Sequence, residues 1–153
     1  MMAITAREAR QQILDDLAAA NEQMALAVAC LGEAFELLDV GSADRLEAGL
    51  FRPAQRAYGR GKRTHNQFAE RSGLAGVEIE PPAAGRTSQG AKAFIERAMA
   101  AAAEADGWLA QLQDSGLPVE SGDPELRSGL SEVRASLGEL PLAGRQFLST
   151  LGR

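Results

Sequence analysis

The chain has 153 residues and a formal net charge of −5, with 45% hydrophobic but only 5% aromatic residues. This length suits one domain with a sizeable core, built largely from Leu and Ala. One Cys and one His cannot supply a structural zinc site or an intramolecular disulfide, so a reducing compartment is expected.

Neither a signal peptide nor a membrane helix is expected. The first twelve residues contain no apolar segment of signal-peptide length. The longest uncharged run in an expected helix, residues 23–32, is about half of what a bilayer crossing needs. We therefore expect a cytoplasmic protein that does not engage a membrane.

The first predicted helix spans residues 5–40. It begins at a capping box, in which Thr5 and Glu8 satisfy each other's free backbone N–H groups. Its apolar residues then alternate in steps of three and four, which is the seam of a heptad pattern. Asn21 is the polar member of this seam and is expected to fix register or oligomeric state. Gly41 is expected to end the helix.

The second predicted helix spans residues 43–72 and follows a cap at Ser42. Small residues lie along its seam, including Ala54, Ala57 and Gly61, and let a neighbouring helix approach closely. Pro53 either kinks this helix or begins its main part. The Pro-containing stretch 74–86 then forms the longest connection.

Two further helices are predicted over residues 88–114 and 123–152. Thr87 or Ser88 caps the third, and Asp123 followed by Pro124 starts the fourth, which breaks near Pro141. Four heptad-patterned helices joined by mostly short turns predict an all-α, up-down-up-down four-helix bundle as a single domain over residues 1–153. The alternative is an elongated helical hairpin that completes its core by dimerising.

The sequence offers no set of catalytic or metal-ligating residues. Di-metal bundles need Glu-x-x-His motifs, and here Lys62 stands three residues before the single His65. Cys30 has a heptad position that faces away from the seam, and nothing places it beside His65, so we expect a half-buried structural Cys. No phosphate-binding glycine motif follows a strand. We therefore expect no enzyme activity, no metal and no cofactor.

Positive charge is concentrated on the second helix. Residues 45–71 carry seven basic and two acidic residues, a net +5 that leaves −10 for the rest of the chain. Five arginines fall within roughly 80° of one another on a helical wheel, opposite the apolar seam. This arginine stripe consists of Arg45, Arg52, Arg56, Arg60 and Arg63. Tyr58 and His65 lie seven residues apart at the edge of the apolar face.

Three interpretations of the stripe compete. It is a solvated face with weak salt bridges, or it binds an acidic surface of a protein partner or of a second copy, or it holds a small anionic ligand. Nucleic acid is disfavoured because the molecule as a whole is acidic. We predict a non-catalytic protein that acts by protein–protein interaction or as a homodimer; the alternative is a bundle that binds a small anionic or apolar ligand. The candidate binding residues are Arg52, Arg56, Tyr58, Arg60, Arg63 and His65.

Overall fold

The computed structural model describes residues 5–74, 76 and 90–151, and within these ranges the regular structure is entirely helical. The all-α prediction is therefore confirmed. In chain order the elements are α1 (Ala6–Glu36), α2 (Val40–Leu46), the π-helical turn η1 (Glu47–Phe51), α3 (Arg52–Arg71), α4 (Ala91–Asp114), α5 (Leu117–Glu120), α6 (Pro124–Gly138) and α7 (Leu140–Leu151). None of the described helices combines the length and the apolar character that a membrane crossing requires.

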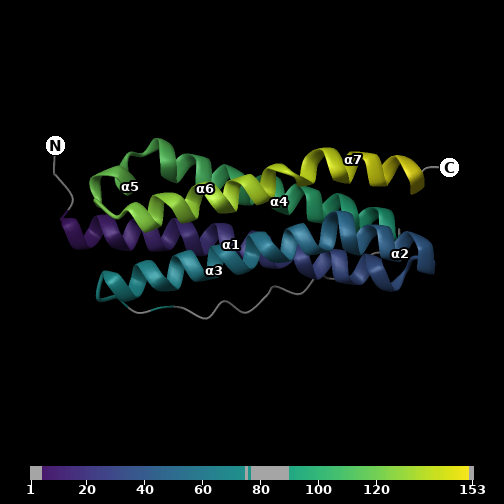
Figure 1. The fold of residues 1–153 in the computed structure, drawn as a ribbon, viewed down its shortest axis with the longest axis horizontal. Helices are drawn as coiled ribbons and strands as arrows, with labels where there is room; N and C mark the ends of the chain where they lie inside the picture. The colour runs from purple at the N-terminus through teal and green to yellow at the C-terminus, as the bar shows by residue number, and fades with distance from the viewer. Residues whose placement is uncertain (1–4, 75, 77–89, 152–153) are drawn as a thin grey trace.

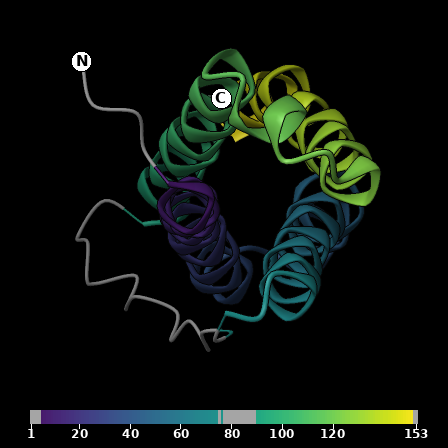
Figure 2. The ribbon, with the colours of Figure 1, turned by 90° about the vertical axis from the view of Figure 1, so that its left-hand side faces the viewer.

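The helices form an elongated bundle around a shared core (Figure 1). α2, η1 and α3 follow one another without a gap, and α6 and α7 are separated only by Glu139. Viewed along the bundle, α1 lies between α3 and α4, and α6 lies across from α1 (Figure 2). α1 packs most extensively against α4, and α3 packs most extensively against α6.

The chain direction differs from the predicted up-down-up-down order. The end of α3 lies beside the start of α6, where Arg71 binds Asp123. The end of α4 leads into α5, which packs against the start of α1. α3 and α4 therefore run in the same direction and antiparallel to α1 and α6, so the order is up-down-down-up (Figure 1).

The length of the connection between α3 and α4 explains why this order is possible. Sixteen peptide steps separate Leu74 from Gly90, and an extended chain of that length reaches about 50 Å. The 24 residues of α4 are about 36 Å long. A chain segment of this length can link two parallel helices, whereas a short turn can link only antiparallel ones.

The first helix ends earlier than predicted. α1 stops at Glu36, and Asp39 caps α2 by accepting a hydrogen bond of 2.8 Å from the N–H of Ser42. This backbone hydrogen bond is the largest of the effects that hold the pKa of Asp39 below its usual range. The prediction of one helix to residue 40 with a cap at Ser42 was wrong, because Asp39, an equally good N-cap three residues earlier, starts the new helix.

Other boundaries follow local chemistry. The Oγ1 of Thr5 accepts from the N–H of Glu8, and Asp123 accepts from the N–H of Leu126, so both predicted N-caps are confirmed. α4 begins at Ala91 after Gly90, and its predicted caps at 87 and 88 lie outside the described residues. The break near Pro141 is confirmed. The short helix α5 was not predicted.

The π-helical turn η1 precedes Pro53, which lies in the first turn of α3. A proline ring clashes with the carbonyl four residues earlier and removes one backbone donor. The N–H of Arg52 here bonds to the carbonyl of Glu47, five residues back. The wider π-helical turn accommodates the proline ring. Regular α-helix resumes at Arg52, next to Pro53, where the main part of the helix was predicted to begin.

A buried contact between Asn21 and Gly61 joins α1 to α3. The side chain of Asn21 is fully buried, and its Nδ2 donates to the carbonyl of Gly61 over 3.1 Å. Its Oδ1 has no hydrogen-bond partner in the described part of the chain. A Cβ on Gly61 would collide with this oxygen and with the Cε of Met24. Asn21 therefore fixes the register between two helices of one chain, as a polar seam residue can.

We predict that Gly61→Ala lowers the free energy of unfolding by about 1–3 kcal/mol, because the new methyl group must push α1 and α3 apart. The matched control is Gly59→Ala, two residues away in the same helix, where a Cβ meets no atom within 4 Å. The control should gain about 0.5–1 kcal/mol from helix propensity. Urea denaturation of both variants measures this difference, and equal stabilities would contradict the proposed close packing.

Candidate binding face on α3 and α6

The arginine stripe divides into exposed and anchored members. Arg52 and Arg63 are exposed and make no ion pair with any described residue. Arg56 reaches Glu139, between α6 and α7, at 3.8 Å, but about half or more of each side chain remains exposed. An ion pair of this length and exposure contributes little to stability. Three guanidinium groups on one helix face are therefore largely free to engage a partner.

Arg60 is the anchored member of the stripe. It is half-buried, and its Nη1 donates to the Oγ of Ser136 on α6 over 2.8 Å. One turn further, Gly129 packs so closely on Thr64 that a Cβ there would lie 2.6 Å from the threonine Oγ1. These contacts fix α3 and α6 side by side and aim the free arginines to one side of their junction.

A groove of about 410 Å³ lies along this junction. Arg60, Arg63 and Arg71 line it from α3, with the hydroxyl of Thr64 and the amide of Gln67. The α6 side contributes Pro124, Glu125, Ser128, Gly129 and Glu132. The groove offers more cationic than anionic groups, together with several neutral hydrogen-bond donors.

Arg71 differs from the stripe arginines because it has a structural role. Its guanidinium binds both oxygens of Asp123 at 2.8 and 3.0 Å, and also Glu125 at 3.0 Å. The hydrogen bond to Asp123 is the main cause that raises the pKa of Arg71. This bidentate pair joins the end of α3 to the start of α6.

Asp123 is both an N-cap and the partner of Arg71. Burial acts to raise the pKa of its carboxyl, but the hydrogen bonds from Arg71 and from the N–H of Leu126 outweigh burial and hold the pKa below its usual range. Its stabilising effect is therefore present above the unfolded pKa, near 3.9, and is lost as the pH falls through the folded value.

We predict that Asp123→Asn lowers the free energy of unfolding at pH 7 by up to about 1 kcal/mol, since asparagine keeps the cap but loses the ion pair. The difference from wild type should narrow as the pH falls below about 4 and the wild-type carboxyl becomes protonated. Chemical denaturation from pH 7 downward measures it. Asp44→Asn, an exposed position on α2, is the control. A gap that persists unchanged at pH 2 would refute the assignment.

Tyr58 and His65 do not join the arginines. Arg60 and Thr64 face α6, whereas Tyr58 and His65 are roughly 160° and 140° around α3 from Arg60 at 100° per residue. Of the six predicted site residues, the structure therefore groups only the four arginines on one face of α3.

The surroundings of these two residues add to the prediction that they lie at the edge of the apolar face. The side chain of His65 is buried, and its Nδ1 lies 2.9 Å from the Oδ1 of Asn66. Tyr58 is half-buried with Lys62 over its ring at 4.4 Å, and burial raises the pKa of its hydroxyl. Both residues pack into the fold, and the extent of burial at His65 was not predicted, because a wheel cannot show how much of a face neighbouring segments cover.

Cys30 and His65 are far apart. The antiparallel pairing of Asn21 with Gly61 places them roughly 20 Å from each other along the bundle axis. Cys30 is fully buried rather than half-buried as predicted, and burial is the main cause that raises the pKa of its thiol. Close packing of the Ala-rich α4 on α1 covers more of α1 than a narrow seam would. The thiol therefore has neither the base nor the access that a nucleophile needs.

Eight of the ten residues that line the groove were not predicted, among them Gln67, Arg71 and Ser128. Arg71 lies about 20° beyond Arg60, just outside the angular range of the arginine stripe, so the helical wheel of residues 45–71 already contains this signal. Ser128 gives no signal, because only the three-dimensional packing brings α6 beside α3. Within the described ranges no group of three or more His, Cys, Asp or Glu side chains is placed to hold a metal ion.

Comparison of the chain with protein-family models, with curated proteins and with solved structures gave no match. The function must therefore be argued from the site itself.

Proposed function

We propose that this protein is a non-catalytic binding protein whose arginine stripe docks onto an acidic surface of a protein partner. The observation that carries the proposal is the presence of three exposed guanidinium groups, Arg52, Arg56 and Arg63, of which only Arg56 has an ion pair with a described residue. Guanidinium groups on a rigid helix present planar donors to carboxylates at fixed spacing. Charge complementarity of this kind steers and orients association.

The contrast with other arginines supports this proposal. Arg71 and Arg134 form bidentate pairs with Asp123 and Asp106, respectively. Arginine–carboxylate pairs therefore join neighbouring helices in this fold. The stripe arginines lack such partners among the described residues, although the rest of the chain carries ten net negative charges. A second copy of the chain is accordingly one source of the acidic surface.

Site-specific photocrosslinking tests the proposal. A photoreactive residue at Gln55, exposed between Arg52 and Arg56, should form a discrete crosslinked product in cells that express the protein. The same residue at Ala100, exposed on α4, should not. The mass of the product distinguishes a second copy from another protein.

Charge reversal makes the test specific. Arg52→Glu/Arg56→Glu/Arg63→Glu should abolish the Gln55 product, because it replaces attraction by repulsion. Arg7→Glu/Arg97→Glu/Arg145→Glu changes the net charge equally at exposed sites elsewhere and should preserve the product. Identical crosslinking in the two triple variants, or from Ala100 and Gln55 alike, would overturn the proposal.

The groove between α3 and α6 favours a second candidate function, the binding of a small anion by Arg60 and Arg63. Guanidinium and hydroxyl donors converge there in a volume of about 410 Å³, and charge-assisted hydrogen bonds are the strong ones.

A thermal-shift titration with citrate or inorganic phosphate at constant ionic strength tests this second candidate, because a ligand that binds only the native state raises Tm. Arg60→Gln/Arg63→Gln should remove the rise, whereas Arg97→Gln/Arg145→Gln should retain it. A rise of equal size in both double variants reports general salt stabilisation and contradicts a site.

A further inference from the structure

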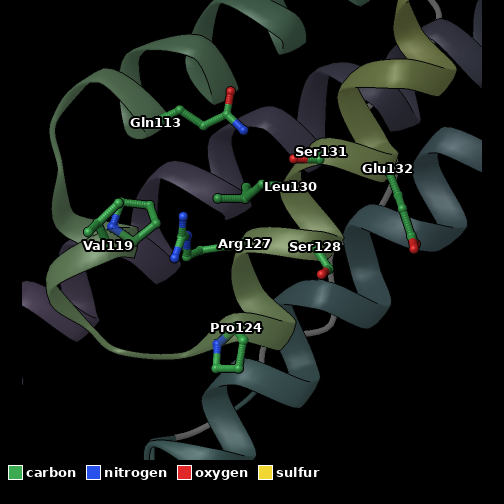
Figure 3. Close-up of a pocket in the computed structure, with 9 residues that line it drawn as sticks. Gln113, Val119, Pro124, Arg127, Ser128, Leu130, Ser131 and Glu132 are labelled. Carbon is green, nitrogen blue, oxygen red and sulfur yellow. The ribbon is translucent and has the colours of Figure 1, made fainter.

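A second cavity lies on the other flank of α6, away from the arginine stripe. It has a volume of about 680 Å³, is open to solvent, and is bounded by the end of α4, by α5 and by α6 (Figure 3). Gly116 adopts a left-handed conformation, with φ of 79°, and turns the chain from α4 into α5. This turn places Val119 at the rim with 61% of its surface exposed, opposite Arg127 on α6.

A chain of three residues fixes the polar wall of this cavity. Asp106 accepts from the Nε and Nη2 of Arg134 at 2.9 and 3.3 Å. The Nη1 of Arg134 donates to the Oε1 of Gln113 over 2.7 Å. The amide oxygen of Gln113 is thereby engaged, and its Nε2 lies on the side of Ser131 (Figure 3). The amide is preorganised as a donor to the cavity.

The remaining polar groups also favour an anion. Arg127 is exposed and has no ion pair within the described residues. The hydroxyl of Ser131 lies on the same helix one turn away, and the side chain of Glu132 points away from Arg127 (Figure 3). The site therefore combines one cation with amide and hydroxyl donors. Its acidic residue is directed elsewhere.

Apolar side chains form the rest of the lining. Pro118 is buried and Val119 is exposed at the rim on α5, and the buried Leu130 lies on α6 beside Ser131 (Figure 3). Ligand sites of a few hundred Å³ typically combine such an apolar lining with a few polar groups. A ligand that satisfies both kinds of group carries a negative group at one end and a short hydrocarbon chain at the other.

We propose that this cavity binds a small monocarboxylate with a short apolar chain. Arg127 takes the carboxylate, Gln113 and Ser131 donate hydrogen bonds to it, and the chain lies against Val119 and Leu130. The site is independent of the arginine stripe and adds a ligand to a protein proposed to dock a partner through α3.

Nuclear magnetic resonance titration of the full chain with hexanoate tests the inference. Backbone amide signals of residues 113–131 should shift in a saturable manner, while those of α3 should not. Hexanamide, which has the same length but no charge, should bind at least tenfold more weakly. Butyrate should also bind more weakly than hexanoate, since it buries less chain against the apolar side chains.

Three substitutions test whether Arg127 binds the carboxylate. Arg127→Gln should weaken hexanoate binding about tenfold or more, because it removes a charge-assisted hydrogen bond. Arg97→Gln, an exposed position on α4 with the same loss of charge, should leave the affinity unchanged. Arg127→Lys should retain part of the affinity, which separates loss of charge from loss of fold.

Three results would overturn the inference: equal binding of hexanamide and hexanoate, unchanged affinity in Arg127→Gln, or shifts confined to the α3–α6 groove. The thermal unfolding curve of each variant confirms that it is folded.

Discussion

The close approach of α1 and α3 at Asn21 and Gly61 is the constraint on which the rest of the arrangement depends. A hydrogen bond from a fully buried amide to a backbone carbonyl favours this register, because without it the Nδ2 of Asn21 would be buried without an acceptor. Fixing α3 against α1 also fixes its neighbouring flank. That flank then presents Thr64 to Gly129 and Arg60 to Ser136, so α6 takes its place from the same contact.

α6 in turn separates two polar regions that are built differently. On the α3 side, the arginines stand on a continuous helix and most of them are free. On the α4 side, Arg134 donates hydrogen bonds to Asp106 and to Gln113, and only the amide nitrogen of Gln113 is left to face the cavity. Ser128 and Glu132 belong to the walls of both regions.

Local rules predicted local structure well. The caps at Thr5 and Asp123, the break before Pro141 and the small-residue seam through Gly61 each depend on neighbours within one or two turns. The predicted helix order was wrong because topology depends on which helix ends lie side by side, and local rules do not determine this. The extent of burial at Cys30 and His65 was not predicted, for a related reason. A heptad seam identifies the centre of a packed face, and neighbouring segments decide how far burial extends around it. The arginines were grouped correctly because a single helix positions them.

Repulsion within the arginine stripe destabilises α3. Arg52, Arg56 and Arg60 follow one another at four-residue intervals, and Arg63 follows three residues later. Like charges at these spacings destabilise a helix by about 0.2–0.5 kcal/mol per pair, so the three neighbouring pairs together cost about 1 kcal/mol. The Arg56–Glu139 contact at 3.8 Å is too exposed to offset this. The two glycines that flank Arg60 weaken the same helix further, although Gly61 is required by Asn21. Carboxylates of the proposed partner would offset this repulsion between the arginines.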